Sequence, residues 1–461
     1  MMKFILFLLL PVGPAYGLTA EDVTSSSMQH FPQIIEAVQR LEEAEQDTRA
    51  AEGAFDAKLK GETDSRTEGY YSGDAYKVSV EKPIPYFGSR IYGGKRQSYG
   101  TFPSYEGKQV TLDDGEFFAG ASVSLLRNSL IDSNRYNIRL RRQDQLQANK
   151  RLRLMQINVQ TMALKAYWTW LIKGRELEVY KNILNLANTR ATQISKRIKA
   201  GDLARIYKVE NDQYIRKRES QVIQSQIEFQ QACFYLGLFY RDKQGRPQKL
   251  TTVDLPKFRQ SKLAKIANTD AIYSRSLQEN LDLQIMSSQM EQAELKIRMG
   301  RNEILPRVDV NFEWNQDQAP GPNPAVQNEN RIMLNVEIPI EYNKGIGKKR
   351  AGEAKLNQLK TKSSWIKDKL SAEVRALVLK LNSFANMFEL TTDQVTFADR
   401  LAKAERRKFS QGASDLILVN IREENMAQAQ IKNLNTLLKY QFVDADIKNV
   451  KVQFVTSPDV K

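Results

Sequence analysis

The sequence predicts an α+β protein in which one unit, a helix followed by strands and a long helical hairpin, occurs twice. Two long stretches lack proline, between Pro103 and Pro247 and between Pro339 and Pro458. Because proline breaks helices, these stretches permit unusually long ones. Strand-like alternation precedes each of them, and the two halves of the chain match each other in sequence.

Composition excludes several classes of protein. The chain has 461 residues and a net charge of +15, but its basic residues are spread along the helical segments, so we expect no nucleic-acid partner. Cys233 is the single cysteine and His30 the single histidine, which excludes an intrachain disulfide and leaves little for a histidine metal site or a catalytic triad. We therefore expect no enzyme, no cofactor and no metal.

The N-terminus has the pattern of a secretory signal peptide. A basic start is followed by the apolar run Phe4 to Leu10, and Ala15 and Gly17 are the small residues that a signal peptidase reads. We predict a signal peptide at 1–17, cut after Gly17. Nowhere else are about 18 apolar residues contiguous, so a membrane crossing by the mature chain must use strands. The predicted fold class is therefore an α+β membrane protein.

The first repeat is predicted at 18–250. A helix at 19–54, capped by Thr19, precedes a region whose apolar period drops to two. The predicted strands there are 57–69, 75–84, 89–99 and 116–127. Aromatic residues cluster in this region, where they fit either a soluble core or the interfacial girdle of a β-barrel.

The helical hairpin at 131–239 follows these strands. Its first helix, 131–199, would be about 100 Å long at ~1.5 Å per residue. Coiled-coil seam spacing recurs on both helices, at Leu152, Met155, Val159, Met162 and Ala166, and at Val222, Ser225, Phe229, Ala232 and Leu236. The glycine at the break, Gly201, suits a helix C-terminus, so we place the hairpin tip there.

A linker at 251–267 separates this unit from its copy at 268–448. At an offset of 249 residues, Leu41-Glu42 match Met290-Glu291. The copy comprises a helix at 268–303, strands at 306–316 and 331–342, and a helical hairpin at 346–448 with a break at 411–413. At an offset of 211, Gly412 matches Gly201. A tail is predicted at 449–461.

This order resembles the outer-membrane efflux protein family, the TolC-like channel-tunnels. The similar segments are Leu18 to Asp22, Ala166-Tyr167-Trp168, Lys199 to Arg205, Ile304 to Val308, Val336 to Ile340, Phe409 to Gly412, and Gly115 to Arg127. The resemblance implies a homotrimer with a 12-stranded-type β-barrel in outer-membrane lipid and a periplasmic α-helical barrel. It further implies a passive exit duct for efflux or type I secretion, docked to a periplasmic adaptor and an inner-membrane pump or ABC transporter.

The resemblance also implies functions for the hairpin tips. Adaptor-docking residues are expected at Gly201, Asp202, Leu203, Gly412, Ala413 and Ser414. Related proteins carry acidic rings past the second tip, where this chain has Leu418 and Ile421, so a hydrophobic constriction is expected instead. In the resemblance, the hairpin tips form the periplasmic mouth of the channel. Polar links that hold this mouth shut are expected at Arg205, Tyr207 and Asp415.

Three other classes of protein remain open. An exported coiled-coil structural protein or adhesin without a pore would explain the helices but not the duplicated strands. A periplasmic adaptor would have one hairpin rather than two. An enzyme is disfavoured because no acid–base, nucleophile or phosphate-binding constellation occurs.

Overall fold

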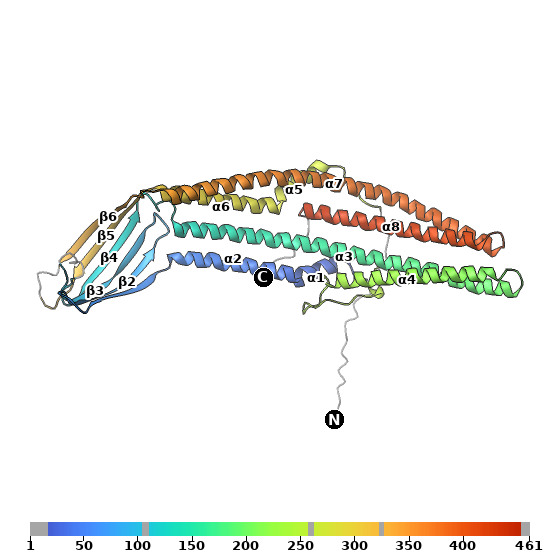
Figure 1. The fold of residues 1–461 in the computed structure, drawn as a ribbon, viewed down its shortest axis with the longest axis horizontal. Helices are drawn as coiled ribbons and strands as arrows, with labels where there is room; N and C mark the ends of the chain where they lie inside the picture. Colours follow the sequence, from blue (N-terminus) through green and yellow to red (C-terminus); the bar gives the residue numbers. More distant parts are fainter. Residues whose placement is uncertain (1–16, 104–109, 257–261, 322–326, 453–461) are drawn as a thin grey trace, which may run out of the picture. The chain divides into compact units, whose positions relative to one another are not determined.

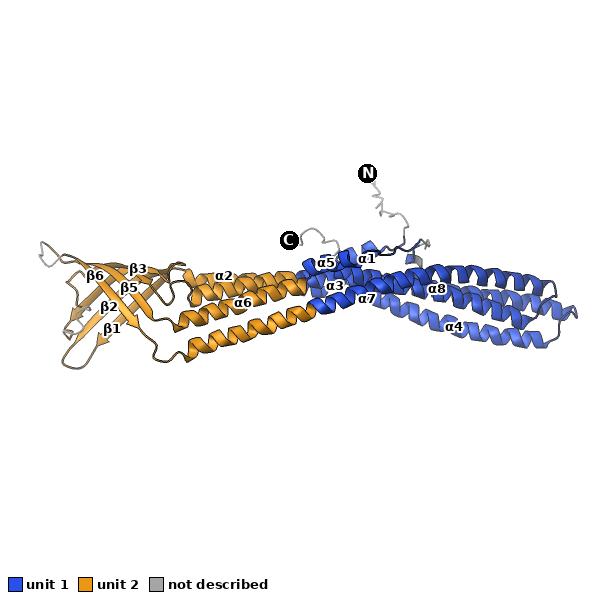
Figure 2. Cartoon of the chain, turned by 90° about the horizontal axis from the view of Figure 1, so that it is seen from above, with its two compact units in different colours: residues 1–37, 152–280, 367–461 blue, residues 38–151, 281–366 orange. Residues whose placement is uncertain are grey.

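The computed structural model describes residues 17–103, 110–256, 262–321 and 327–452 (Figure 1). These residues form two compact units (Figure 2). Unit 1 contains the described parts of 1–37, 152–280 and 367–461, and unit 2 contains those of 38–151 and 281–366. Residues 1–16 of the predicted signal peptide, the centre of the linker (257–261) and most of the tail (453–461) lie outside the described residues.

Unit 2 contains a six-stranded antiparallel sheet in which the strands follow their order in the sequence. The strands are β1 (Lys58–Arg66), β2 (Gly73–Pro83), β3 (Arg90–Gly100), β4 (Glu116–Ser124), β5 (Arg307–Asp317) and β6 (Asn328–Glu337). The predicted extension of the last strand to residue 342 is wrong. The strand ends before Pro339, which lacks the N–H that a ladder requires.

The sheet holds more strands than the four per chain that a twelve-stranded trimeric barrel takes. Twelve strands from three chains require four strands in each chain, whereas the described sheet holds six. The twelve-strand expectation came from the family resemblance alone, and the alternating pattern of this chain already indicated six segments.

The two faces of the sheet have opposite polarity. Because side chains alternate along a strand, the register places one set of residues on each face. One face is apolar and exposed, with Leu59, Val78, Val80, Ile91, Phe117, Phe312, Ile332, Leu334 and Val336. The other is polar and buried, with Ser79, Ser98, Glu116, Ser122, Ser124, Asp309, Asn311, Glu313 and Asn315. A sheet folded in water buries its apolar face instead.

Each helix predicted ahead of the strands is two helices. The first is α1 (Ala20–His30) and α2 (Pro32–Glu52), separated at Phe31 because Pro32 cannot continue the hydrogen-bond ladder. The second is α5 (Thr269–Glu279) and α6 (Leu281–Ile304), separated at Asn280, whose backbone is extended. Phe31 and Asn280 are related by the same offset of 249 residues as the repeat.

Two helical hairpins follow the strands. The first is α3 (Ser133–Lys199) with α4 (Ile206–Gly237), and the second is α7 (Asn343–Ser410) with α8 (Leu416–Val450) (Figure 1). The described residues also include two short 3-10 helices, at Gly53–Phe55 and Thr252–Asp254. No helix among the described residues is long and apolar enough to cross a membrane.

The main core of unit 1 lies between α3 and α4, around the fully buried Trp170. All five predicted seam residues of α4 are buried or packed against apolar neighbours, which confirms that spacing. On α3 the prediction fails at Met162, which is 36% exposed, while Ala163 is fully buried. A straight helix drifts relative to a strict seven-residue repeat, so the buried stripe moves by one position.

Candidate functional site at the hairpin tips

The two tips share one backbone geometry. At the first, the Gly201 N–H donates to the Ile198 carbonyl at 3.1 Å, and the Asp202 N–H to the Arg197 carbonyl at 2.9 Å. At the second, the same two bonds join Gly412 to Phe409 and Ala413 to Lys408. Both glycines have positive φ, +83° and +78°. These are Schellman caps, in which a left-handed glycine satisfies the last carbonyls of a helix.

The six predicted docking residues differ in accessibility. Gly201 and Asp202 are exposed at the first tip, and Gly412 and Ala413 are exposed at the second. Leu203 instead packs against an apolar cluster made by Ile194, Phe409, Leu416 and Val419. The Ser414 hydroxyl donates to the Glu405 carboxylate at 2.5 Å. Leu203 therefore packs the first tip against the second, Ser414 ties the second tip to its own helix α7, and the other four residues form the accessible surface.

This apolar cluster joins the two hairpins within unit 1. Ile194 belongs to α3, Phe409 to α7, and Leu416 and Val419 to α8. Arg197 adds a polar tie, since its Nη1 donates to the Phe409 carbonyl at 3.4 Å and its guanidinium lies 5.8 Å from the Phe409 ring centroid. The first tip and the second tip are thus packed against each other.

A buried ionic network lies beside the tips and draws on all four helices of the hairpins. Glu423 of α8 is fully buried and pairs with Arg190 of α3 at 2.5 Å and with Arg218 of α4 at 3.0 Å. Arg406 of α7 approaches the same carboxylate at 3.4 Å. Burial lowers the pKa of the Arg190 guanidinium, and Glu423 opposes that shift. We call these four residues, together with Asn420, the arginine network.

Asn420 and a backbone carbonyl complete the arginine network. Arg190 Nη1 donates to Asn420 Oδ1 at 2.7 Å, and Arg218 Nη2 donates to the same oxygen at 3.4 Å. Arg218 Nη1 donates to the Ile183 carbonyl at 2.7 Å. Separating the partners of a buried ion pair strongly destabilises the folded protein. Because this network joins all four helices, it fixes the two hairpins in one register.

The predicted gate residues are not linked to one another. Asp415 is the N-cap of α8, and its side chain accepts a hydrogen bond from the Ile417 N–H. Tyr207 packs at the margin of the apolar tip cluster, and Arg205 is exposed. Within the residues that the structure describes, no hydrogen bond or ion pair joins the side chains of these three. Leu418 and Ile421 are exposed on α8, at 38% and 46%.

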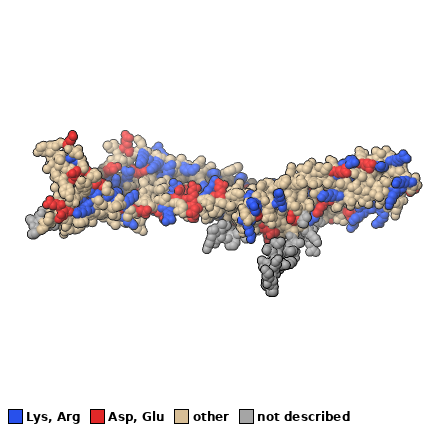
Figure 3. All heavy atoms as spheres, turned by 90° about the horizontal axis from the view of Figure 1, so that it is seen from below, with Lys and Arg blue, Asp and Glu red and all other residues tan. Residues whose placement is uncertain are grey.

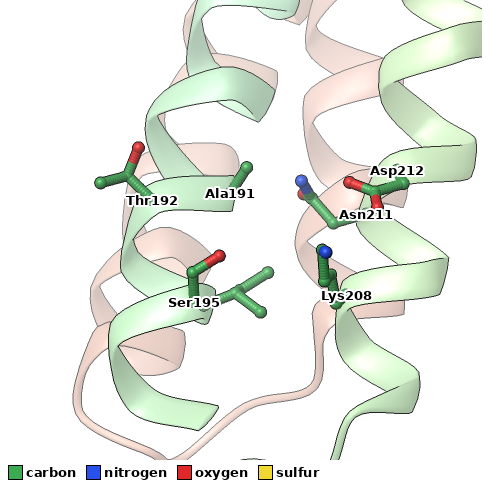
Figure 4. Close-up of a pocket in the computed structure, with 7 residues that line it drawn as sticks. Ala191, Thr192, Ser195, Lys208, Asn211 and Asp212 are labelled. Atoms are coloured by element: carbon green, nitrogen blue, oxygen red, sulfur yellow. The ribbon is translucent and has the colours of Figure 1, made fainter. Parts of the chain in front are cut away.

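A groove of about 320 Å³ opens between α3 and α4 beside the first tip (Figure 4). It is lined by Ala191, Thr192, Ile194, Ser195, Lys208, Asn211 and Asp212. Figure 4 shows Asn211 extending from α4 toward α3, with Ser195 on the facing wall. Asn211 is almost fully buried and donates to the Ala187 carbonyl at 3.3 Å. The groove thus combines hydroxyl, amide and charged groups on a small surface.

The tips carry an excess of basic side chains. The last turn of α3 contains Lys196, Arg197 and Lys199, and the last turn of α7 contains Arg407 and Lys408. Basic groups also show on the surface at this end of the hairpins (Figure 3). Cations at a helix C-terminus interact favourably with the helix dipole, so these residues stabilise both helix ends. They also give the tips a positive surface.

Sequence analysis missed the arginine network. The signal was a charged residue at a position of the buried stripe: Glu423 lies four residues after Val419 and three before Met426, both of which are buried. Arg190 likewise falls between the buried Ala187 and Ile194. A charge in such a position needs a buried partner, and this criterion finds both residues.

The structure is similar to several solved membrane proteins. A membrane protein from Pseudomonas aeruginosa superposes with a TM-score of 0.68 and 12% identity over 98% of this chain and 97% of that one. The Neisseria gonorrhoeae MtrE outer membrane channel gives a TM-score of 0.67 and 12% identity, covering 95% of this chain and 89% of that one. The chain has the outer-membrane channel fold. This confirms the resemblance found in the sequence at the level of architecture.

Other channels share the outer-membrane channel fold with this chain. The Campylobacter jejuni CmeC outer membrane channel gives a TM-score of 0.65 and 10% identity, covering 95% of this chain and 87% of that one. No protein-family model matches the chain, and neither does any curated protein. The relatives in fold are channels rather than enzymes.

Proposed function

We propose that this protein is a subunit of a trimeric outer-membrane exit duct for efflux or secretion. The observation that carries the proposal is the inverted polarity of the sheet, whose apolar face is exposed and whose polar face is buried. Transmembrane barrels have this pattern, since the outer face contacts lipid and the inner face lines water. The outer-membrane channel fold supports the same conclusion.

Several chains are needed to close the barrel. Strands β1 and β6 are the two edges of the sheet, and edge strands leave unpaired backbone groups. Hydrocarbon cannot satisfy those groups, so β1 of one chain pairs with β6 of the next in the proposed assembly. An exported coiled-coil protein or adhesin without a pore would not need the exposed apolar face.

The assembly is tested by its location and its electrical behaviour. We expect outer-membrane fractions to contain a heat-modifiable trimer, and the purified trimer to form conducting channels in planar bilayers. Recovery of the protein as a water-soluble periplasmic species that never conducts would refute the proposal. N-terminal sequencing of the same trimer should begin at Leu18, because we propose that the signal peptide is cut after Gly17.

We propose that the tips dock a periplasmic adaptor, which connects the duct to an inner-membrane pump or ABC transporter. The accessible backbone at Gly201 and Gly412 supports this assignment, as do the exposed Asp202 and Ala413 beside them. The groove between α3 and α4 offers a polar recess next to the first tip. The basic surface of the tips favours an acidic partner.

Photo-crosslinking tests the docking surface. A photoreactive residue at Asp202 or Ala413 should give an adduct with the adaptor in cells that express the complete pump. The exposed position Lys360, in unit 2, is the control and should give none. Absence of adducts at both tips in an assembled pump would refute docking there.

For the mouth, we propose a hydrophobic constriction rather than an acidic ring. Leu418 and Ile421 are the exposed apolar residues at the positions concerned. A Leu418→Asp variant would introduce one carboxylate per chain and should shift the reversal potential toward cation selectivity. An unchanged reversal potential in a conducting channel would exclude Leu418 from the mouth.

Asp415 is exposed and caps α8 through one carboxylate oxygen, and we propose that its other oxygen is available for a polar link at the mouth. Arg205 and Tyr207 are proposed to make polar links between neighbouring chains. Arg205→Ala channels with wild-type opening frequency would contradict that role.

A further inference from the structure

The two halves of the chain differ by one β-hairpin. Strand β5 begins at Arg307, which lies 249 residues after Lys58, the first residue of β1. Strands β4 and β6 are equivalent in another way, since each leads directly into a long helix, α3 or α7. Strands β2 and β3, at 73–100, therefore have no counterpart in the second half.

The ends of this additional hairpin meet each other. Gly73 and Gly100 are paired across the ladder. Immediately outside them, the Thr101 N–H donates to the Ser72 carbonyl at 2.8 Å. Residues 73–100 thus leave the chain and return to it at one point, as an inserted element does.

The hairpin is nonetheless part of the sheet rather than an appendage. β2 pairs with β1 from Gly73↔Arg66 to Glu81↔Lys58, and β3 pairs with β4 from Arg90↔Ser122 to Arg96↔Glu116. At its turn, the Phe87 carbonyl accepts a hydrogen bond from the Ser124 N–H at 3.1 Å. Both sides of the hairpin are therefore covered by neighbouring strands.

Side chains on both faces of the hairpin continue the pattern of the sheet. Val78 and Val80 are exposed on the apolar face, and Ser79 and Ser98 are buried on the polar face. Arg96 of β3 reaches across β4 on the polar face, where its Nη2 donates to Glu313 Oε1 at 3.3 Å and to Asn315 Oδ1 at 3.2 Å. These bonds tie the hairpin to β5 as a section of the wall.

We infer that the β2–β3 hairpin widens the outer pore, so that a closed trimer has an 18-stranded wall and passes bulkier solutes than a twelve-stranded duct does. The inference rests on the proposed trimeric barrel. Three copies of the six-stranded sheet give 18 strands. Since barrel diameter grows roughly linearly with strand number, the wall is about 1.5 times as wide as one built from four strands per chain.

Strand counting in the assembled protein tests the inference. Cryo-electron microscopy of the full-length trimer should show 18 strands around the barrel. A variant lacking residues 73–100 joins Ser72 to Thr101 without stretching the chain, and it should show 12. A wild-type trimer with a twelve-stranded wall and the hairpin elsewhere would overturn the inference while leaving the exit duct intact. A protein that forms no membrane trimer would overturn both.

Polymer exclusion supplies a second readout that does not need the deletion variant to fold. Polyethylene glycols of graded size are added from the outer side of a bilayer that contains the wild-type channel. We expect the exclusion diameter to exceed by about 1.5-fold that of a twelve-stranded channel of the same fold. Equal exclusion diameters would overturn the inference.

Discussion

The arginine network makes Glu423 the residue whose charge matters most for unit 1. A Glu423→Gln substitution keeps the shape of the side chain but removes the anion. Arg218 is fully buried and Arg190 nearly so, and both would then lie in the interior without a counter-charge. Removing one partner of a buried ion pair costs about 3–5 kcal/mol. Because glutamine retains one acceptor oxygen, we expect the lower end, about 3 kcal/mol.

The adjacent residue provides a matched control. Glu424 pairs with Lys217 at 3.5 Å, and the Lys217 side chain is half exposed. The Glu424 side chain is 19% exposed, but its cationic partner reaches solvent, and the glutamine oxygen can still accept from Gln221, so Glu424→Gln should cost only about 1 kcal/mol. Guanidinium unfolding of the detergent-solubilised protein, followed by circular dichroism at the helical minimum, gives the midpoint of each variant.

We expect a clearly lower midpoint for Glu423→Gln than for Glu424→Gln. A second substitution, Arg218→Met, in the Glu423→Gln background should restore part of the loss, since it removes a charge left without a partner. Equal midpoints for the two single variants would refute the conclusion that this network holds the hairpins in register.

Three further predictions follow from single positions. Gly412→Ala should lower the free energy of unfolding by about 1–2 kcal/mol, because the φ of Gly412 is +78°. Gly347→Ala, in α7 with open space around it, should raise the free energy of unfolding. Equal shifts in the two variants would contradict the capping role of Gly412. Hydrogen bonds from Gln224 and Lys173 lower the pKa of the Glu228 carboxyl in the folded protein. The ionised carboxylate therefore stabilises the fold above the unfolded pKa of about 4.3, and this stabilisation is lost as the pH falls through the folded pKa. The free energy of unfolding should consequently change less between pH 6 and pH 3 in Glu228→Gln than in the wild type. A Cβ at Gly94 would lie 2.1 Å from the Val78 carbonyl, so Gly94→Val should abolish the heat-resistant trimer. Survival of the trimer in Gly94→Val would contradict the tight β2–β3 pairing.

Features encoded by local chemistry were predictable from the sequence. Gly201 and Gly412 are tips because a left-handed backbone favours glycine, and this requirement does not depend on the rest of the fold. The strands were equally predictable. Successive side chains of a strand point to opposite faces of the sheet, so two faces of different polarity give the sequence an alternation of apolar and polar residues. The break before Pro32 was available to sequence analysis and was overlooked.

Features that depend on partners distant in the sequence were not predictable. Glu423 is separated from Arg190 by most of the second half of the chain, so its burial becomes evident only when the helices are assembled. Asp415 was predicted as a gate residue, and its additional role as the N-cap of α8 becomes evident only from the geometry of the helix start. The number of strands expected of each chain was taken from the resemblance, although the additional hairpin was present in the alternating pattern of the sequence.

The arginine network also has a consequence for the order of folding. Arg190 and Arg218 belong to the first half of the chain, and their carboxylate is supplied by the second. Until Glu423 has been synthesised, the first hairpin has two arginines that cannot be buried at low cost. Contacts between residues so far apart in sequence form slowly. The first hairpin therefore reaches its packed state only after the second arrives, and either half expressed alone should remain loosely packed.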